Sequence, residues 1–335
     1  MKSSSASMPK GSISYLPQSD SHRLRGYLFI AGATLFWGIS ATLGRAVFTG
    51  RLIPGEALSP IDPLILAQTR TTIAFLLLAP VLLARRGVKA TVITSRRDLL
   101  LCLAVGVLGM AAANYFYYLA IERTNVATAI ILQYTAPVWV LLYMVARRLQ
   151  RASAQRVMAV GLAVFGSAMA VGIIGTGEFN ADRLGILAAL VAALAFAYYN
   201  VSGSHLVRRY DRWRVLSHVL LGAALFWIVV NPPWVILRAN YSASQWLFMV
   251  VFSITSILIP FSLYFGGLQW LDATRAIVTS CLEPVLSIVI AAIFLGELVT
   301  WLQVAGMAVV LLATVVVQLP ERGKRNPAMH IEPIE

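Results

Sequence analysis

Ten apolar runs, each about as long as a membrane-spanning helix, follow one another along the chain with short polar segments between them. A bilayer core about 30 Å thick needs roughly 20 helical residues to cross it. Runs of that length lie at about residues 26–48, 62–84, 98–120, 124–146, 156–174, 183–204, 214–236, 245–268, 272–295 and 299–318. The pattern predicts an all-α polytopic membrane protein with ten transmembrane helices.

The positions of lysine and arginine test the number of spans and predict the orientation of the chain in the membrane. If the amino terminus is cytoplasmic, the cytoplasmic segments hold 21 of the 27 Lys and Arg residues and the outer connections hold 4. Basic residues gather on the cytoplasmic side, and an odd number of spans would have mixed the two sets. We therefore expect both termini in the cytoplasm, with cytoplasmic connections at 85–97, 147–156, 205–214 and 269–275.

Composition excludes a soluble domain. Hydrophobic residues make up 59% of the chain and charged residues 12%, whereas about 25% of a soluble domain is charged. The formal charge of +13 comes from short clusters between apolar runs, which indicates membrane orientation and not a nucleic-acid partner. Cys102 and Cys281 lie inside apolar runs and provide neither a disulfide framework nor a metal site. We predict no metal and no cofactor.

Two stretches repeat one another at a spacing of 147 residues. YYLAIERTNVATAIILQYTAP occupies 117–137 and YFGGLQWLDATRAIVTSCLEP occupies 264–284, so one register aligns both the tyrosines and the prolines. Each stretch has an aromatic helix end, a short polar link and a proline inside the next span. The alternative is a chance alignment of two apolar helices.

A duplicated unit of five spans begins on opposite sides of the membrane, because five is odd. The predicted organisation is therefore a disordered cytoplasmic tail at 1–25, a first five-helix repeat at 26–174, a second at 183–318 and a cytoplasmic tail at 319–335. The two repeats are expected to be inverted, an arrangement that many secondary transporters use around a site at the membrane midplane.

The chain resembles the drug/metabolite transporter superfamily, in particular its EamA-type exporters. The strongest likeness is in the second copy, where EP in the ninth span and LGE before the tenth look like the family pattern. In the first copy FWGISATLGRA and LAQTRTTIAFLL fit, but ARRLQRAS stands where a GE-type ending is expected, so no functional carboxylate is carried to that position. The resemblance covers about residues 26–318 and implies two five-helix repeats that export small metabolites, often amino acids.

Glu283 is the clearest candidate for a transport residue. It lies near the middle of the ninth span, and an ionisable group at that depth costs several kcal/mol unless it has a role or a partner. It can bind a proton or an amine. The alternative is a structural glutamate that is hydrogen-bonded or permanently protonated.

Two prolines mark a second group of candidates. A proline inside a helix leaves the carbonyl four residues earlier without its partner, here that of Gln133 for Pro137 and that of Ser280 for Pro284. In lipid such a carbonyl must face protein or a water-lined cavity, so we expect helix kinks and a substrate pocket between these helices. The alternative is a kink filled by neighbouring hydroxyl groups.

Further candidates come from charge, faces and aromatic rings. Arg70, inside the second span, is assigned to an outer gate or to a substrate carboxylate, although it could snorkel or pair with a carboxylate. Tyr264 shares one face of the eighth span with small polar residues that either line an aqueous route or only allow close packing. Trp37, Tyr198 and Tyr199 are candidates for stacking on a flat or cationic substrate.

These features together predict a secondary transporter in the bacterial inner membrane that exports small metabolites such as amino acids by alternating access. Proton coupling and facilitated diffusion are both left open, and the alternative substrate class is lipophilic cations or drugs. We do not expect an enzyme. The expected partners are the lipid bilayer and a small-molecule substrate, with no nucleic acid and with the chain as a monomer or homodimer.

Overall fold

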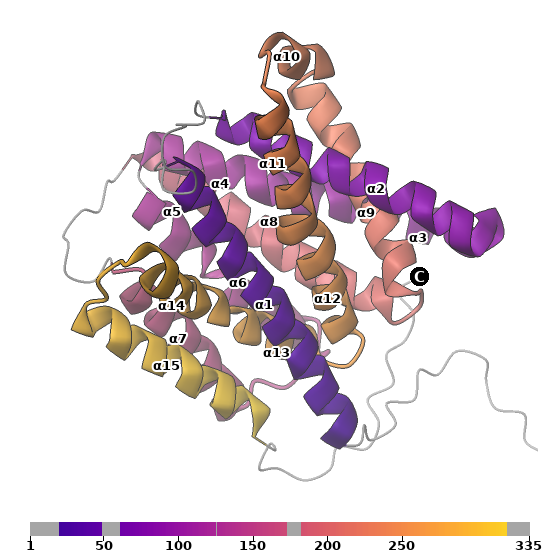
Figure 1. Cartoon of the computed structure of the whole chain (residues 1–335). Coiled ribbons are helices and arrows are strands. Elements are labelled where there is room, and N and C mark those ends of the chain that lie inside the picture. The colour runs from indigo at the N-terminus through magenta and orange to yellow at the C-terminus, as the bar shows by residue number, and fades with distance from the viewer. Residues whose placement is uncertain (1–19, 49–60, 125, 173–181, 320–335) are drawn as a thin grey trace, which may run out of the picture.

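The computed structural model describes residues 20–48, 61–124, 126–172 and 182–319, which form a bundle of helices without a strand in these ranges (Figure 1). The elements are α1 (Asp20–Phe48), α2 (Pro63–Thr91), α3 (Arg96–Ala104), η1 (Val105–Ala111), α4 (Ala112–Arg123), α5 (Val126–Gln133), α6 (Ala136–Ala146), α7 (Ala154–Ala170), α8 (Arg183–Val207), α9 (Arg212–Val230), α10 (Pro233–Arg238), α11 (Ala243–Ser253), η2 (Ile254–Leu258), α12 (Ile259–Leu268), α13 (Ala273–Ser280), α14 (Leu282–Leu295) and α15 (Trp301–Gln318).

Ten apolar helices account for the predicted spans. In the described ranges nine stretches are long and apolar enough to cross a membrane, and α7 is a shorter apolar helix of 17 residues. Four of the spans are composite: α3–η1–α4, α5–α6, α11–η2–α12 and α13–α14. The expected all-α fold of ten membrane helices is confirmed.

Two boundaries differ from the hydropathy pattern. Helix α1 begins at Asp20, so residues 20–25 are helical instead of belonging to the expected tail, whereas residues 1–19 and 320–335 lie outside the described residues. The seventh span was expected to reach residue 236, but α9 ends at Val230 and the short helix α10 follows. Pro232 and Pro233 cause this break, because proline cannot donate a backbone hydrogen bond and keeps the preceding residue extended.

Side-chain caps begin most of the spans. The first free N–H groups of a helix need acceptors, and an Asp, Ser or Thr side chain at the preceding position supplies one. The caps are Asp62 on α2, Ser95 on α3, Ser153 on α7, Asp182 on α8, Asp211 on α9, Ser242 on α11, Asp272 on α13 and Thr300 on α15.

Irregular turns occur at matching places in the two halves of the chain. The π-helical turn η2 in the eighth span falls within η1 of the third when 147 residues are subtracted. The fourth span is interrupted at Tyr134–Thr135 and the ninth at Cys281, again 147 residues apart. Packing is matched as well, because α4 packs on α8, α12 packs on α1, and α7 and α15 pack on each other.

Small residues allow the closest helix contacts. A Cβ atom added at Gly306 of α15 would lie 2.3 Å from the backbone nitrogen of Ala170 in α7, and one at Gly166 would lie 2.8 Å from that of Val310. Figure 1 shows α7 and α15 side by side along one flank of the bundle. Van der Waals contact between small residues holds helices together in lipid, where apolar burial between them contributes little.

The substitution Gly306→Ala is expected to lower the melting temperature of the detergent-solubilised protein. The added methyl group meets backbone atoms of α7, which cannot move aside cheaply, and overpacking of this kind costs about 1–3 kcal/mol. Gly161→Ala is the matched control, because a Cβ at this position of α7 has no heavy atom within 4 Å. Equal melting temperatures for the two variants would contradict the close contact.

Candidate functional site

A cavity of about 680 Å³ lies between spans from both halves of the chain. This volume suits a small metabolite, since ligand pockets commonly measure about 300–1,000 Å³. Its polar lining consists of Ser40, Arg70, Asn114, Gln133, Ser256, Ser280, Glu283, Ser287, Glu297 and Gln303, and its aromatic lining of Trp37, Tyr117, Tyr118, Tyr134, Phe196, Tyr199, Phe252 and Phe261. The bundle therefore gathers polar groups that lipid would not tolerate into one space.

Arg70 reaches the cavity from α2 and is held there by α4. Its Nη2 donates a hydrogen bond to Oδ1 of Asn114, whose own amide donates to the carbonyl of Met110 at 2.7 Å. The Phe252 ring lies 6.0 Å from the guanidinium carbon. The Nε of Arg70 is buried and has no hydrogen-bond partner among the described residues. The guanidinium thus keeps one N–H donor without a partner among the described residues.

Glu283 stands in the first turn of α14, which begins directly after the interruption at Cys281. A carboxylate at a helix amino terminus is stabilised by the helix dipole, so the interruption offsets part of the cost of burying this charge. The charge of Arg70 acts on Glu283, and that of Glu283 acts on Tyr117 and Tyr134. These four side chains share one electrostatic neighbourhood.

No ion pair within 4 Å joins Arg70 to Glu283. Both side chains line the same cavity while remaining apart. A basic and an acidic group separated in this way present two opposite charges to a molecule that enters between them. The arrangement can hold a ligand carrying a carboxylate at one end and an ammonium at the other.

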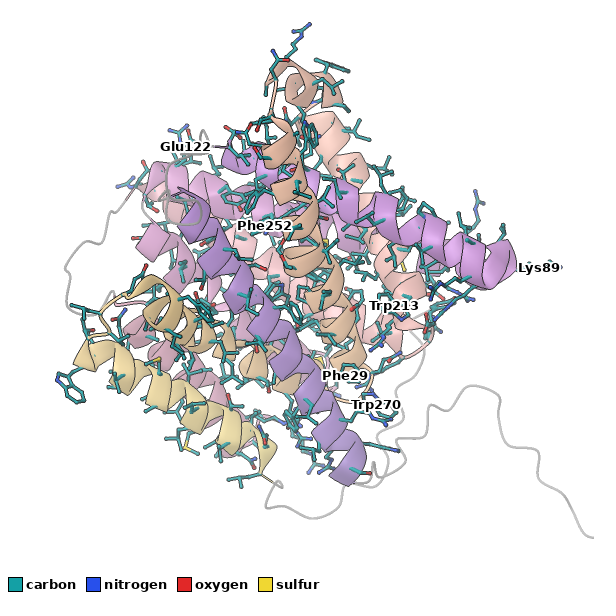
Figure 2. The ribbon with its side chains drawn as sticks, viewed as in Figure 1. Phe29, Lys89, Glu122, Trp213, Phe252 and Trp270 are labelled. Carbon is teal, nitrogen blue, oxygen red and sulfur yellow. The ribbon has the colours of Figure 1, made fainter. Side chains whose placement is uncertain are left out.

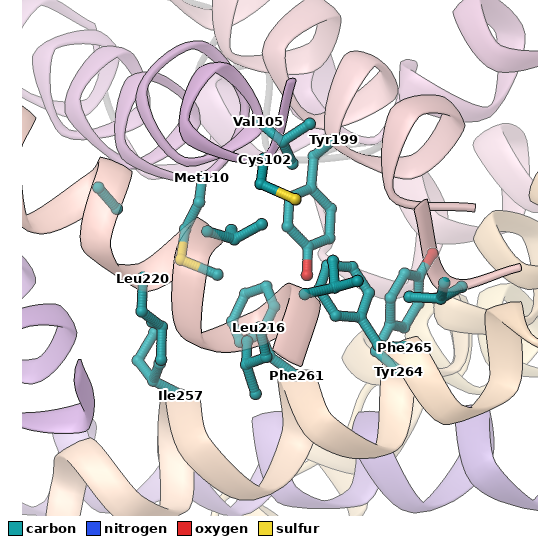
Figure 3. Close-up of a cluster of buried hydrophobic side chains, with 14 of the residues drawn as sticks. Cys102, Val105, Met110, Tyr199, Leu216, Leu220, Ile257, Phe261, Tyr264 and Phe265 are labelled. Carbon is teal, nitrogen blue, oxygen red and sulfur yellow. The ribbon is translucent and has the colours of Figure 1, made fainter. Parts of the chain in front are cut away.

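A layer of aromatic rings borders the same cavity as Arg70 and Glu283. Tyr199 stacks on Phe265 at a centroid distance of 5.2 Å and meets the edge of Phe261 at 5.5 Å (Figure 3). The Trp37 ring lies 5.2 Å from that of Phe261. Tyr264 is fully buried in this layer and donates a hydrogen bond to Oδ1 of Asn200. The layer closes the cavity on the side of α12.

Most of the residues singled out from the sequence come together here. Glu283, Ser280, Gln133, Arg70, Trp37 and Tyr199 line the cavity, as do the two prolines Pro137 and Pro284. Two candidates do not line it. Tyr264 lies behind the lining, where it contacts Trp37, and Tyr198 lies beside Tyr143 and Ser202.

Sequence reasoning missed several lining residues, among them Asn114, Tyr117 and Tyr134. Asn114 was not singled out, although an amide inside an apolar span carries the same signal as a charge. Tyr117 ends the third span within an aromatic cluster, a pattern typical of a membrane-interface anchor and not of a site residue. Tyr134 had no distinguishing signal, since its place in the cavity depends on the interruption between α5 and α6.

Comparison with known proteins assigns the chain to a family. A sequence model of the EamA-like transporter family matches residues 24–172 and again residues 183–319. The chain belongs to the EamA-like transporter family. It is an integral membrane protein, and the resemblance to this family is confirmed.

Several EamA-like relatives are similar over long stretches. The uncharacterized inner membrane transporter YicL of Salmonella typhimurium is 22% identical over 307 residues, covering 91% of this chain and 98% of that protein. The threonine/homoserine exporter RhtA of Escherichia coli is 26% identical over 208 residues, covering 61% of this chain and 66% of that protein. A solved crystal structure superposes with a TM-score of 0.72 at 19% identity, covering 91% of this chain and all of that one, which shows the same fold.

Replacing Asn114 by alanine is expected to lower the melting temperature of this EamA-like protein. The change removes the acceptor that holds the Arg70 guanidinium, and a lost hydrogen bond to a charged group costs about 1.5–3 kcal/mol. In the background of Arg70→Met the same change should cost far less, because no guanidinium is left unsatisfied. Additive effects of the two substitutions would show that the side chains are not coupled.

Proposed function

We propose that this chain is a secondary transporter that exports small zwitterionic metabolites such as amino acids. The observation that carries the proposal is the placement of Arg70 and Glu283 in one cavity without a direct ion pair between them. An amino acid carries a carboxylate and an ammonium group, and each needs an opposite charge when water is removed. Arg70 would receive the carboxylate through its guanidinium, and Glu283 the ammonium.

The alternative substrate class is lipophilic cations or drugs. Glu283 and the aromatic lining would suit a cation. A guanidinium in the same cavity repels a cation, however, and its positive charge and unpaired N–H donor favour an anionic partner. The Arg70 side chain therefore favours the zwitterion over the cation.

Alternating access between two inverted repeats is the proposed mechanism. The matched π-helical turns, the matched interruptions and the exchanged packing partners support a two-fold relation between the halves. Polar binding sites of inverted-repeat transporters lie at the repeat interface beside broken helices, and Gln133 and Ser280 border such breaks here.

Orientation and direction complete the proposal. The charge distribution supports cytoplasmic termini, and the similarity to an inner membrane transporter supports the bacterial plasma membrane. Export is supported by the similarity to threonine/homoserine exporters. Proton-coupled and facilitated transport are both compatible with the Glu283 carboxylate in the cavity. The proposed partners are lipid and substrate, with the chain as a monomer or homodimer and without enzymatic activity.

Flux measurements on reconstituted vesicles test this function. Vesicles would be loaded with a panel of amino acids or of lipophilic cations, with and without a pH gradient. Wild-type protein is expected to move amino acids, and Glu283→Gln and Arg70→Gln should each reduce the flux by more than about tenfold, the loss expected when a charge-assisted contact is removed.

Two exposed residues provide matched controls for these variants. Glu122 and Arg238 lie outside the cavity lining, so Glu122→Gln and Arg238→Gln should leave flux unchanged. Amino-acid flux that persists in both cavity variants would contradict the proposed site. Transport of cations alone, enhanced by Arg70→Gln, would favour the alternative substrate class.

A further inference from the structure

Two polar clusters join the halves of the chain at the end of the bundle away from the cavity mouth. In the first, the Asp98 cluster, Nη1 of Arg209 lies 3.0 and 3.2 Å from the two carboxylate oxygens of Asp98, and the Tyr210 hydroxyl donates to Oδ2 at 2.7 Å. The Asp98 side chain is only 8% exposed. This cluster ties the start of α3 to the connection between α8 and α9.

The second, the Asp272 cluster, ties the connection before α13 to the first repeat. The carboxylate of Asp272 lies 3.5 Å from Nη2 of Arg156 in α7 and 3.6 Å from Nε of Arg275. Beside it the Thr274 hydroxyl donates to Oε1 of Gln150 at 2.8 Å. Burial raises the pKa of Asp272. The charges of Arg156 and Arg275 together lower it by more, so the pKa lies below its ordinary value. The carboxylate is charged at neutral pH.

The cavity opens away from both clusters. Its lining includes Glu297, Leu298 and Val299 in the connection between α14 and α15, where the Leu298 side chain is 96% exposed. No lining residue comes from the connections 85–97, 147–156, 205–214 or 269–275, to which the clusters belong. Figure 2 shows Lys89, Trp213 and Trp270, from three of these connections, far from Glu122 at the other end.

The repeat register relates one cluster to the cavity mouth. Subtracting 147 from Glu297 and Gln303, which border the mouth, gives Gln150 and Arg156 of the Asp272 cluster. The register is reliable here because the caps Thr300 of α15 and Ser153 of α7 share it. The same structural position therefore lines the cavity in one repeat and joins the two halves of the chain in the other.

We infer that the Asp98 and Asp272 clusters form a latch that holds the cytoplasmic side closed in this outward-open state and that separates in the opposite state. The inference rests on the proposed alternating-access function. Loss of Arg209 would leave the Asp98 carboxylate, which is 8% exposed, without its cation. Loss of Arg156 would leave Asp272 with Arg275 alone. Burial penalises each uncompensated carboxylate and water stabilises it. Loss of a latch charge should therefore shift the population toward the state in which that side is hydrated.

Cysteine labelling measures how accessible the open cavity and the closed side are to water, and it needs no substrate. The background would be Cys102→Ala/Cys281→Ala, since both native cysteines are free. Ile121→Cys reports on the open cavity, which Ile121 lines. Leu268→Cys reports on the closed side, because Leu268 is its counterpart at the 147-residue spacing and is fully buried.

The latch predicts reciprocal changes in labelling by a water-soluble maleimide. Arg209→Gln and Arg156→Gln should each raise the labelling rate at Leu268→Cys on the order of tenfold, as expected when a minor state becomes well populated, and should lower it at Ile121→Cys. Arg86→Gln is the control. It removes a 2.5 Å ion pair to Asp211 on the same face, but both of those side chains are 42% exposed, so little change is expected.

Unchanged labelling at both reporters would overturn the latch and leave the clusters as structural contacts. A rise at both reporters together would also overturn it, because loosening of the whole fold exposes the two sides alike. Asp98→Asn provides a second variant of the Asp98 cluster if Arg209→Gln does not fold. The readout is independent of flux, so a failure of the proposed substrate would not imitate either outcome.

Discussion

The high free energy of a charged or unpaired polar group in hydrocarbon is the constraint on which this structure depends. It explains why Arg70, Asn114 and Glu283 lie in one cavity and not on the lipid-facing surface. It also explains the composition of the exposed helix faces, where side chains such as Ile293, Phe294 and Leu311 are apolar. Because ten apolar helices must keep their charged groups away from lipid, these groups gather in one internal site with charges of both signs.

Close packing by small residues allows the helices to enclose the polar cavity. Glycines at the contact of α7 with α15, and at the contact of η1 with α9, bring backbones together where a methyl group would not fit. The interruptions in α5–α6 and α13–α14 supply the complementary effect, because they end regular hydrogen bonding at the cavity and place Glu283 in the first turn of α14. Packing and interruption together allow a polar pocket within an apolar bundle.

Much of the fold could be predicted from the sequence, and the reason is the same constraint. Spans of fixed length and the bias of Lys and Arg toward one side are direct consequences of the bilayer, so the ten helices were apparent from hydropathy alone. Hydropathy does not give the end of a helix that proline terminates, such as the end of α9 before Pro232. The depth of Glu283 and Arg70 marked them as site residues, but their sharing of one cavity depends on the crossing of α2, α4 and α14, which no local pattern encodes. Asn114 and Tyr134 were missed for that reason, and Tyr198 was selected although its ring faces other neighbours.

Equilibrium binding of charge-blocked ligands separates a zwitterion site from a cation site. The solubilised protein would be titrated with amino acids from the transport panel, each beside its methyl ester, which keeps only the ammonium, and its N-acetyl derivative, which keeps only the carboxylate. Two opposite charges in one cavity predict that both blocked forms bind at least about tenfold more weakly than the amino acid. A methyl ester that binds as tightly as the free amino acid would show that Arg70 does not receive a carboxylate and would contradict the zwitterion site.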